Sequence, residues 1–182
     1  MTKGPISGHV FIATSLDGFI ARPDGAIDWL PGLDSDPGEN YGYDAFIASV
    51  DGLVMGRNSF EKVLTFDEWP YPKPVVVLSR SLDATSLREE LRGKVEFSAL
   101  APAALFDSLA RRGWSRVYVD GGQVIQSFLR AGLISDMVIT RVPVLLGEGL
   151  PLFGALDGDI ALRHDETRAY PSGLVQSRYS IA

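Results

Sequence analysis

The chain contains no cysteine, and this absence excludes several classes of protein at once. A disulfide framework, a zinc site with thiolate ligands, an iron–sulfur cluster and a cysteine nucleophile all need that residue. Basic residues are also in the minority, because 17 Lys and Arg face 23 Asp and Glu and give a formal net charge of −6. A protein that binds nucleic acid by neutralising phosphates usually has the opposite balance. We therefore expect neither a bound metal nor a nucleic-acid partner.

Long hydrophobic runs are missing as well. The apolar stretch near the start is interrupted by Ser15 and Asp17, which makes it too short for a signal peptide or a membrane span. The sequence also has no internal repeat and no low-complexity tract, and 182 residues is a little more than one typical domain. These features predict a single cytoplasmic domain over residues 1–182, with no membrane partner.

Short apolar runs alternate with amphipathic segments along most of the chain. Strands are predicted over residues 8–14, 53–55, 74–78, 94–97, 116–119 and 136–142, and helices over residues 41–49, 102–112 and 123–131. A further helix is expected to start at Asn58, with Glu61 as its capping-box partner. Residues 159–182 are typical of a hairpin with its turn at 170–173. The order predicts an α/β fold with a mainly parallel sheet, helices on both faces and an antiparallel C-terminal edge.

Two junctions after predicted strands carry residues suited to an anionic ligand. At residues 55–59 (MGRNS), Gly56 lets a ligand approach the backbone, the helix start offers free N–H groups and Arg57 adds a cation. After the strand at 74–78, Ser79 and Arg80 suit a phosphomonoester such as the ribose 2′-phosphate of NADP. The alternatives are a simple turn with a surface arginine and an ordinary polar loop.

A third junction lies in residues 117–129 (VYVDGGQVIQSFL), where an apolar strand runs into Gly121 and Gly122 and then into a helix. Successive backbone N–H groups in such a turn can cradle a pyrophosphate. The spacing is not the GxGxxG fingerprint of the ordinary dinucleotide fold. A tight turn without a ligand is the alternative.

The order of five segments, TSLDGFIA, DGLVMGRNSFEKV, PVVVLSRSL, VYVDGGQVIQSFL and RVPVLLGEGLPLFG, resembles the dihydrofolate-reductase-like superfamily. It is most similar to the branch that contains the reductase half of the bifunctional riboflavin-biosynthesis deaminase/reductase, and the resemblance runs from His9 to Tyr179. It implies a central, mostly parallel sheet of about eight strands flanked by helices, with NADPH across the strand ends. The implied activity is hydride transfer to a small heterocyclic substrate, pterin-like or pyrimidine-like. Because the deaminase signature needs cysteine, a stand-alone reductase is expected.

The resemblance also implies which residues contact the cofactor. Ala13 and Ile20 would flank the nicotinamide, and the two arginines at the phosphate junctions favour NADPH over NADH. The full set implied for the cofactor is Ala13, Ile20, Gly56, Arg57, Asn58, Ser59, Leu78, Ser79, Arg80, Val119, Gly121, Gly122, Gln123, Val124 and Ile125.

Catalytic acids are harder to assign. In dihydrofolate reductases an acid on the helix after the first loop helps to protonate the substrate, and Glu39 and Asp44 are the candidates here, although each could be a solvated helix or cap charge. Asp17 of the S-x-D-G pattern either touches the substrate or organises its loop. Asp120 is expected to orient the glycine turn, and His9 is expected to be structural.

Substrate contacts are expected from Asp28, Trp29 and Tyr41, of which Trp29 could equally anchor its loop. A phosphorylated sugar substrate is disfavoured, because basic residues outside the cofactor motifs, such as Arg22 and Arg141, are scattered. True dihydrofolate reductase and a nucleotide-binding module with little catalysis remain alternatives. Apolar residues in 138–146 and 150–153 are expected to form a homodimer surface.

Overall fold

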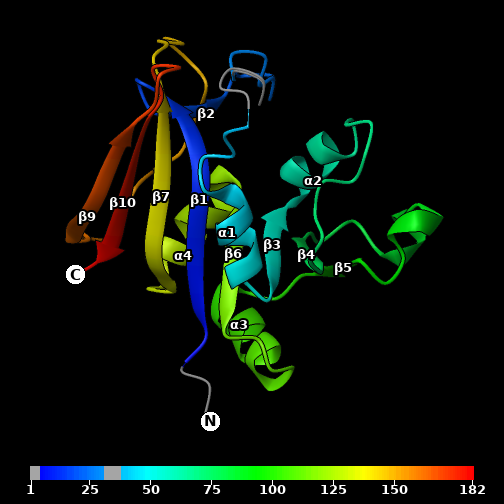
Figure 1. Cartoon of the computed structure of the whole chain (residues 1–182). Helices are drawn as coiled ribbons and strands as arrows, with labels where there is room; N and C mark the ends of the chain where they lie inside the picture. The colour runs from blue at the N-terminus through cyan, green and yellow to red at the C-terminus, as the bar shows by residue number, and fades with distance from the viewer. Residues whose placement is uncertain (1–4, 31–37) are drawn as a thin grey trace.

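An eight-stranded sheet forms the centre of the molecule in the computed structural model, which describes residues 5–30 and 38–182 (Figure 1). The strands follow the order β5-β4-β3-β6-β1-β7-β10-β9. Their bounds are β1 (Ser7–Ser15), β3 (Gly52–Gly56), β4 (Val75–Leu78), β5 (Val95–Ser98), β6 (Arg116–Asp120), β7 (Ile134–Val142), β9 (Leu162–Ala169) and β10 (Val175–Ile181). All pairs from β5 to β7 are parallel, and β10 and β9 add antiparallel strands. The predicted mixed sheet with an antiparallel C-terminal edge is confirmed.

Helices cover both faces of this sheet (Figure 1). They are α1 (Tyr43–Ser49), α2 (Arg57–Val63), α3 (Pro102–Arg111) and α4 (Gly122–Arg130), and two short 3₁₀ helices, Ala84–Ser86 and Glu89–Leu91, precede β5. Strand β6 shows the alternation that builds the two layers. Val117 and Val119 pack in one cluster with α3 and α4, whereas Tyr118 packs in the other with α1 and α2.

A small second sheet lies beside the main one. It pairs β2 (Phe19–Ala21) with β8 (Leu150–Pro151) in antiparallel fashion. The amide of Leu152 also donates to the carbonyl of Gly18. The loop after β1 and the segment after β7 are therefore joined in one unit.

Two expected helix starts are wrong. Helix α1 begins at Tyr43, because Asn40 accepts a hydrogen bond from the amide of Gly42 and closes a turn at residues 40–42. Helix α2 begins at Arg57 with Gly56 as its N-cap, so Asn58 does not cap it. The strand runs without a linker into the helix, and Glu61 binds Arg57 instead of closing a capping box.

The expected dimer surface is only partly exposed. Val138, Ile139 and Val142 are buried in the sheet, because β7 is covered on both faces and paired on both edges. Leu145 and Phe153 are exposed. In the described ranges, no helix is both long and apolar enough to cross a membrane.

Candidate functional site

The carboxyl ends of β4, β3 and β6 lie next to one another, so the three predicted junctions share one edge of the sheet. Gly56 is in register with Leu78, and Met55 is in register with Asp120. Parallel strands bring their carboxyl ends to the same edge, which is where ligands of open α/β sheets bind. The structure thus assembles one extended surface from segments that are far apart in the chain.

The glycines of this surface leave the backbone open. Gly121 has a φ of 89°, and a Cβ there would come within 2.5 Å of Ser59 Oγ. A Cβ on Gly122 would come within 2.9 Å of both the Ile20 side chain and the Pro151 carbonyl oxygen. Gly121 is the N-cap of α4 and supplies no side-chain cap. Backbone N–H groups at the start of α4 therefore face this edge, and the narrow cradle fits a pyrophosphate.

The polar side chains of the first two junctions are linked. Arg57 donates through Nε to Glu61 (2.7 Å) and through its terminal nitrogen to Ser81 Oγ (3.2 Å). Ser79 Oγ accepts from the amides of Ser81 (3.2 Å) and Leu82 (3.0 Å), which closes the turn after β4. Arg80 is exposed on this turn. The structure adds Ser81 to the predicted residues; the Ser-Arg-Ser spacing in the sequence was the available signal.

Asp17 joins two loops. Its carboxylate accepts from Ser15 Oγ (2.6 Å), from the Leu146 amide (3.1 Å) and from the Gly147 amide (2.8 Å). These bonds, with that to Ser15 foremost, lower the pKa of Asp17 below its ordinary value. Of the two expected roles, the geometry supports organisation of the loop, and Asp17 stabilises the segment that carries Ile20 towards Gly122.

A cavity of about 190 Å³ opens beside the carboxyl halves of β1 and β7. Its walls include the aromatic side chains of Phe11, Tyr41 and Tyr43, with Ala13 at the strand. Trp29 packs in the same apolar cluster as Ala13 and Tyr41. Three of the residues expected near nicotinamide or substrate therefore come together.

The three acids expected to serve the substrate are engaged elsewhere. Asp28 is held by Arg22 through two hydrogen bonds of 2.7 and 3.0 Å, and Arg22 is the main cause of its lowered pKa. Glu39 accepts from the Tyr41 amide at 2.7 Å. Asp44 is exposed and accepts from the Asn40 side chain at 2.7 Å. Each of these carboxylates stabilises a turn or a surface ion pair.

Asp120 is the acid that the structure places in the site. It ends β6, points to the same face as Tyr118 and lies in the electrostatic environment of Tyr43 and Tyr71. Burial raises the pKa of Asp120 from 3.8 to about 6, although hydrogen bonds from Gly121 and Tyr118 partly oppose this. Burial also raises the pKa of Tyr43 to about 12, so that side chain stays a neutral phenol. Sequence reasoning assigned Asp120 to the loop; its position two residues after a buried tyrosine was the signal for this face.

Asp120 and the small cavity are neighbours through shared residues. Tyr43 lines the cavity and also interacts with Asp120. Phe11 lines the cavity, its ring centroid lies 5.7 Å from that of Tyr43, and its carbonyl accepts from the Tyr118 hydroxyl (2.9 Å). A carboxyl with a raised pKa beside an aromatic pocket is suited to proton transfer.

His9 belongs to a separate polar network at the opposite edge of the sheet. It is buried, with Nδ1 2.7 Å from Asp136 and Nε2 3.0 Å from Ser7. Both ring nitrogens are thus used between β1 and β7 near their amino ends. The network is remote from the glycine cradle, and a structural role fits it.

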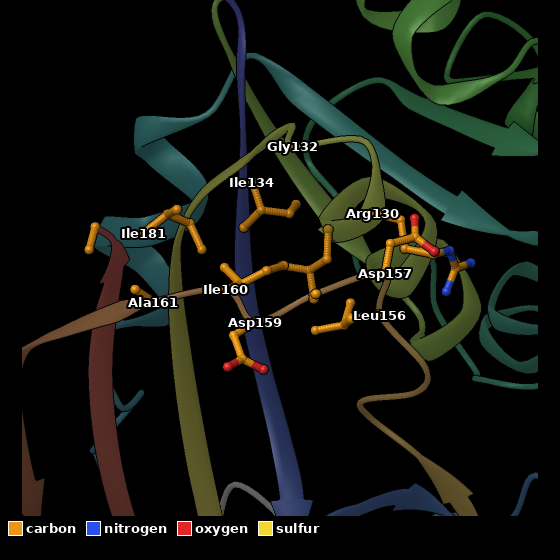
Figure 2. A pocket seen from close by; sticks show the side chains of 12 residues that line it. Arg130, Gly132, Ile134, Leu156, Asp157, Asp159, Ile160, Ala161 and Ile181 are labelled. Atoms are coloured by element: carbon orange, nitrogen blue, oxygen red, sulfur yellow. The ribbon is translucent and has the colours of Figure 1, made fainter.

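A larger cavity, of about 410 Å³, also lies at the opposite edge (Figure 2). Figure 2 shows Ile134 and Ile160 at its apolar wall and Arg130 beside Asp157 at its rim. It adjoins the amino end of β7, whereas the three junctions lie at the carboxyl ends of the strands. Its size therefore does not make it part of the candidate site.

Comparisons with known proteins agree with this architecture. The family model described as the RibD C-terminal domain matches residues 8–176. The uncharacterised protein YwjB of Bacillus subtilis (strain 168) is 36% identical over 165 residues, which cover 88% of this chain and 90% of that protein. A crystal structure from Shewanella sp. PV-4, of a protein provisionally assigned to riboflavin biosynthesis, is 40% identical with a TM-score of 0.90, and covers 97% of this chain and 99% of its own.

A more distant solved structure shares the fold alone. It is the diaminohydroxyphosphoribosylaminopyrimidine deaminase/5-amino-6-(5-phosphoribosylamino)uracil reductase of Thermotoga maritima, at 14% identity and a TM-score of 0.75. The match covers all of this chain but 58% of that one. The present chain thus has the length of one part of that enzyme.

Proposed function

Because the chain belongs to the RibD C-terminal domain family, we propose that it is an NADPH-dependent reductase of a small heterocyclic substrate, pterin-like or pyrimidine-like. The family membership confirms the resemblance to the riboflavin-type reductase branch. The observation that carries the proposal is the placement of Asp120, a buried acid at the end of β6, between the glycine cradle and an aromatic pocket.

The chain offers a group for each part of the dinucleotide. The open backbone at Gly121 and Gly122 would hold the pyrophosphate, and the turn of Ser79 and Arg80 would hold the 2′-phosphate. Ala13 lines the aromatic pocket and Ile20 packs against Gly122, which suits both to flank the nicotinamide. When bound, NADPH supplies the hydride from C4 of its nicotinamide ring.

Asp120 would supply the proton. Reduction of a C=N or C=O bond adds a hydride to carbon and a proton to the heteroatom. With a pKa of about 6, Asp120 is partly protonated near neutral pH, so it can give its proton to that heteroatom and be reprotonated from solvent. The aromatic rings around it exclude water and orient a flat ring.

Nucleotide binding tests the proposal first. NADPH and NADH are titrated into the protein and followed by fluorescence, with Arg111→Ala as a control at an exposed arginine of α3. We expect saturable NADPH binding that is weakened by Arg57→Ala and unchanged by Arg111→Ala. Absence of binding by both nucleotides would refute the proposed function. Consumption of NADPH with pterin and pyrimidine substrates, including dihydrofolate, then separates a reductase from a binding module.

A cytoplasmic homodimer is part of the same proposal. Leu145 is 70% exposed and Phe153 is 47% exposed, and both follow the carboxyl end of β7. Exposed apolar side chains of this size are suited to contact a second copy. The predicted mass is tested below.

A further inference from the structure

The pocket beside Asp120 carries no formal charge of its own among its lining side chains. Phe11, Tyr41 and Tyr43 supply aromatic surface, and Asn40 and Thr140 supply neutral polar groups. We infer that this pocket selects an uncharged, flat heterocycle without a phosphate group. The inference rests on the proposed function and narrows its substrate class.

Cations close to the pocket already have partners. Arg22 is bound bidentately by Asp28, at 2.7 and 3.0 Å. The guanidinium of Arg168 lies over the Tyr170 ring at 4.8 Å and reaches Glu39 at 3.5 Å. A substrate phosphate would have to displace these acids before it could pair with either arginine.

Strand geometry removes another candidate cation. Arg141 lies between Thr140 and Val142 in β7, and these two residues line the pocket. Because side chains alternate along a strand, Arg141 points to the other face of the sheet. The sequence from 31 to 37, PGLDSDP, contains two acids and no Lys or Arg. A phosphate dianion entering the pocket would therefore lose water without gaining a cation, which is strongly unfavourable.

Neutral donors are present instead. Thr140 Oγ1 accepts from Gln176 Nε2 at 3.0 Å, so its own O–H can donate to a second acceptor. The same Gln176 amide donates to the Tyr41 carbonyl at 3.0 Å and fixes the wall. Trp29 Nε1 is buried and finds no acceptor within residues 5–30 and 38–182. Such donors suit the carbonyl oxygens and ring nitrogens of a neutral heterocycle.

The size of the pocket points the same way. Its volume of about 190 Å³ lies below the roughly 300–1,000 Å³ of typical ligand sites. One or two fused rings fit this space, whereas a ribose phosphate would extend into solvent. The substrate is thus expected to be recognised by its ring and not by a phosphate handle.

Matched pairs of compounds test this inference. The probes are 7,8-dihydroneopterin with its monophosphate, and 5-amino-6-ribosylaminouracil with its 5′-phosphate, each titrated calorimetrically with and without NADP⁺. We expect the unphosphorylated member of at least one pair to bind about tenfold more tightly than its phosphate. Equal or tighter binding of the phosphates, or binding of no member of either pair, would overturn the inference.

A gain-of-charge variant tests the cause. Leu30 lines the pocket at 38% exposure, so Leu30→Arg adds a cation at its mouth. The variant should bind the phosphorylated members about fivefold more tightly than the natural chain does, whereas Leu145→Arg, at an exposed leucine outside the lining, should not. An unchanged preference in Leu30→Arg would contradict the assignment to missing charge. NADPH is titrated into every variant, because its failure to bind refutes the proposed function separately from the pocket preference.

Discussion

Ser59 and Gly121 approach so closely that a Cβ on the glycine would lie 2.5 Å from the serine hydroxyl oxygen. This contact joins the start of α2 to the start of α4, which follow two neighbouring strands of the sheet. The glycine also has a φ of 89°, a conformation that costs other residues about 1–2 kcal/mol. Two separate physical demands therefore meet at one position of the proposed pyrophosphate cradle.

Substitution of Gly121 by Ala is predicted to damage both stability and nucleotide binding. The added methyl group must displace Ser59, so we expect NADPH affinity to fall at least about tenfold and the free energy of unfolding to fall by about 1–3 kcal/mol. Gly132→Ala is the matched control, since Gly132 also has a positive φ, of 67°, but nothing within 4 Å of a Cβ. It should lose stability and keep its NADPH affinity. Equal NADPH affinity in the two variants would remove the cradle from the binding site.

Arg80 is predicted to distinguish NADPH from NADH. It is exposed on the turn that Ser79 closes at the end of β4, where a 2′-phosphate would lie. Removal of a cation from a phosphate costs a charge-assisted hydrogen bond, so Arg80→Ala should weaken NADPH binding about tenfold and leave NADH binding unchanged. The two dissociation constants are measured by fluorescence. A parallel loss for both nucleotides would place Arg80 away from the 2′-phosphate.

Local sequence patterns predicted the parts of the fold that depend on local chemistry. The strand ending in Leu78 and that ending in Gly56 could be identified from their apolar runs, and parallel pairing then brings their ends together. Asn58 was misplaced as a cap because the composition of a capping box is present, but the chain enters the helix one residue earlier, directly from the strand. Local composition does not determine where a strand stops pairing.

Long-range contacts account for the site residues that the sequence did not reveal. The raised pKa of Asp120 depends on its burial in the completed fold, near Tyr43 and Tyr71 from two other segments. Asp17 binds an amide 129 residues away. Asp28 looked available for substrate until its pairing with Arg22 was seen. Each of these outcomes requires the assembled tertiary structure.

Asp17 is predicted to control the order of the segment after β7. The substitution Asp17→Asn removes the charge that accepts from the amides of Leu146 and Gly147, so these two amides should exchange hydrogen with solvent at least several-fold faster. Hydrogen exchange read by mass spectrometry or NMR measures this. Asp24→Asn is the control, because Asp24 accepts only from the nearby Ala26 amide in its own turn. Unchanged exchange at both amides would show that the clasp does not stabilise the segment.

The oligomeric state is predicted to depend on Leu145. In size-exclusion chromatography with light scattering, the natural chain should have twice the mass of one protomer. Leu145→Glu places a charge on the exposed apolar surface and should shift the mass towards that of a monomer, whereas Leu100→Glu, at another exposed leucine, should not. A monomeric natural chain would refute the dimer.

Asp120 is predicted to make the protein less stable as the pH rises. Its pKa is about 6 in the folded chain and 3.8 as the ordinary value, so between these pH values the folded state binds more protons than the unfolded state. The free energy of unfolding therefore falls across this window, by about 2–3 kcal/mol at most, and is flat above it. Chemical denaturation at pH 4 and pH 7.5 measures the change. Asp120→Asn should abolish this contribution and be the more stable protein at pH 7.5, whereas Asp107→Asn, at an exposed carboxyl of α3, should behave like the natural chain.

Catalysis should depend on Asp120 in the opposite sense. If the protonated carboxyl donates the proton, turnover falls as the pH rises through about 6, and Asp120→Asn loses both this limb of the profile and about 10²-fold in rate. NADPH affinity should stay within about twofold, because the side chain faces the aromatic pocket and the cradle is backbone. A variant that keeps the natural pH profile would assign the proton to another group. A variant that loses nucleotide binding along with activity would instead assign Asp120 to the cradle, so the two measurements together separate proton donation from cofactor binding.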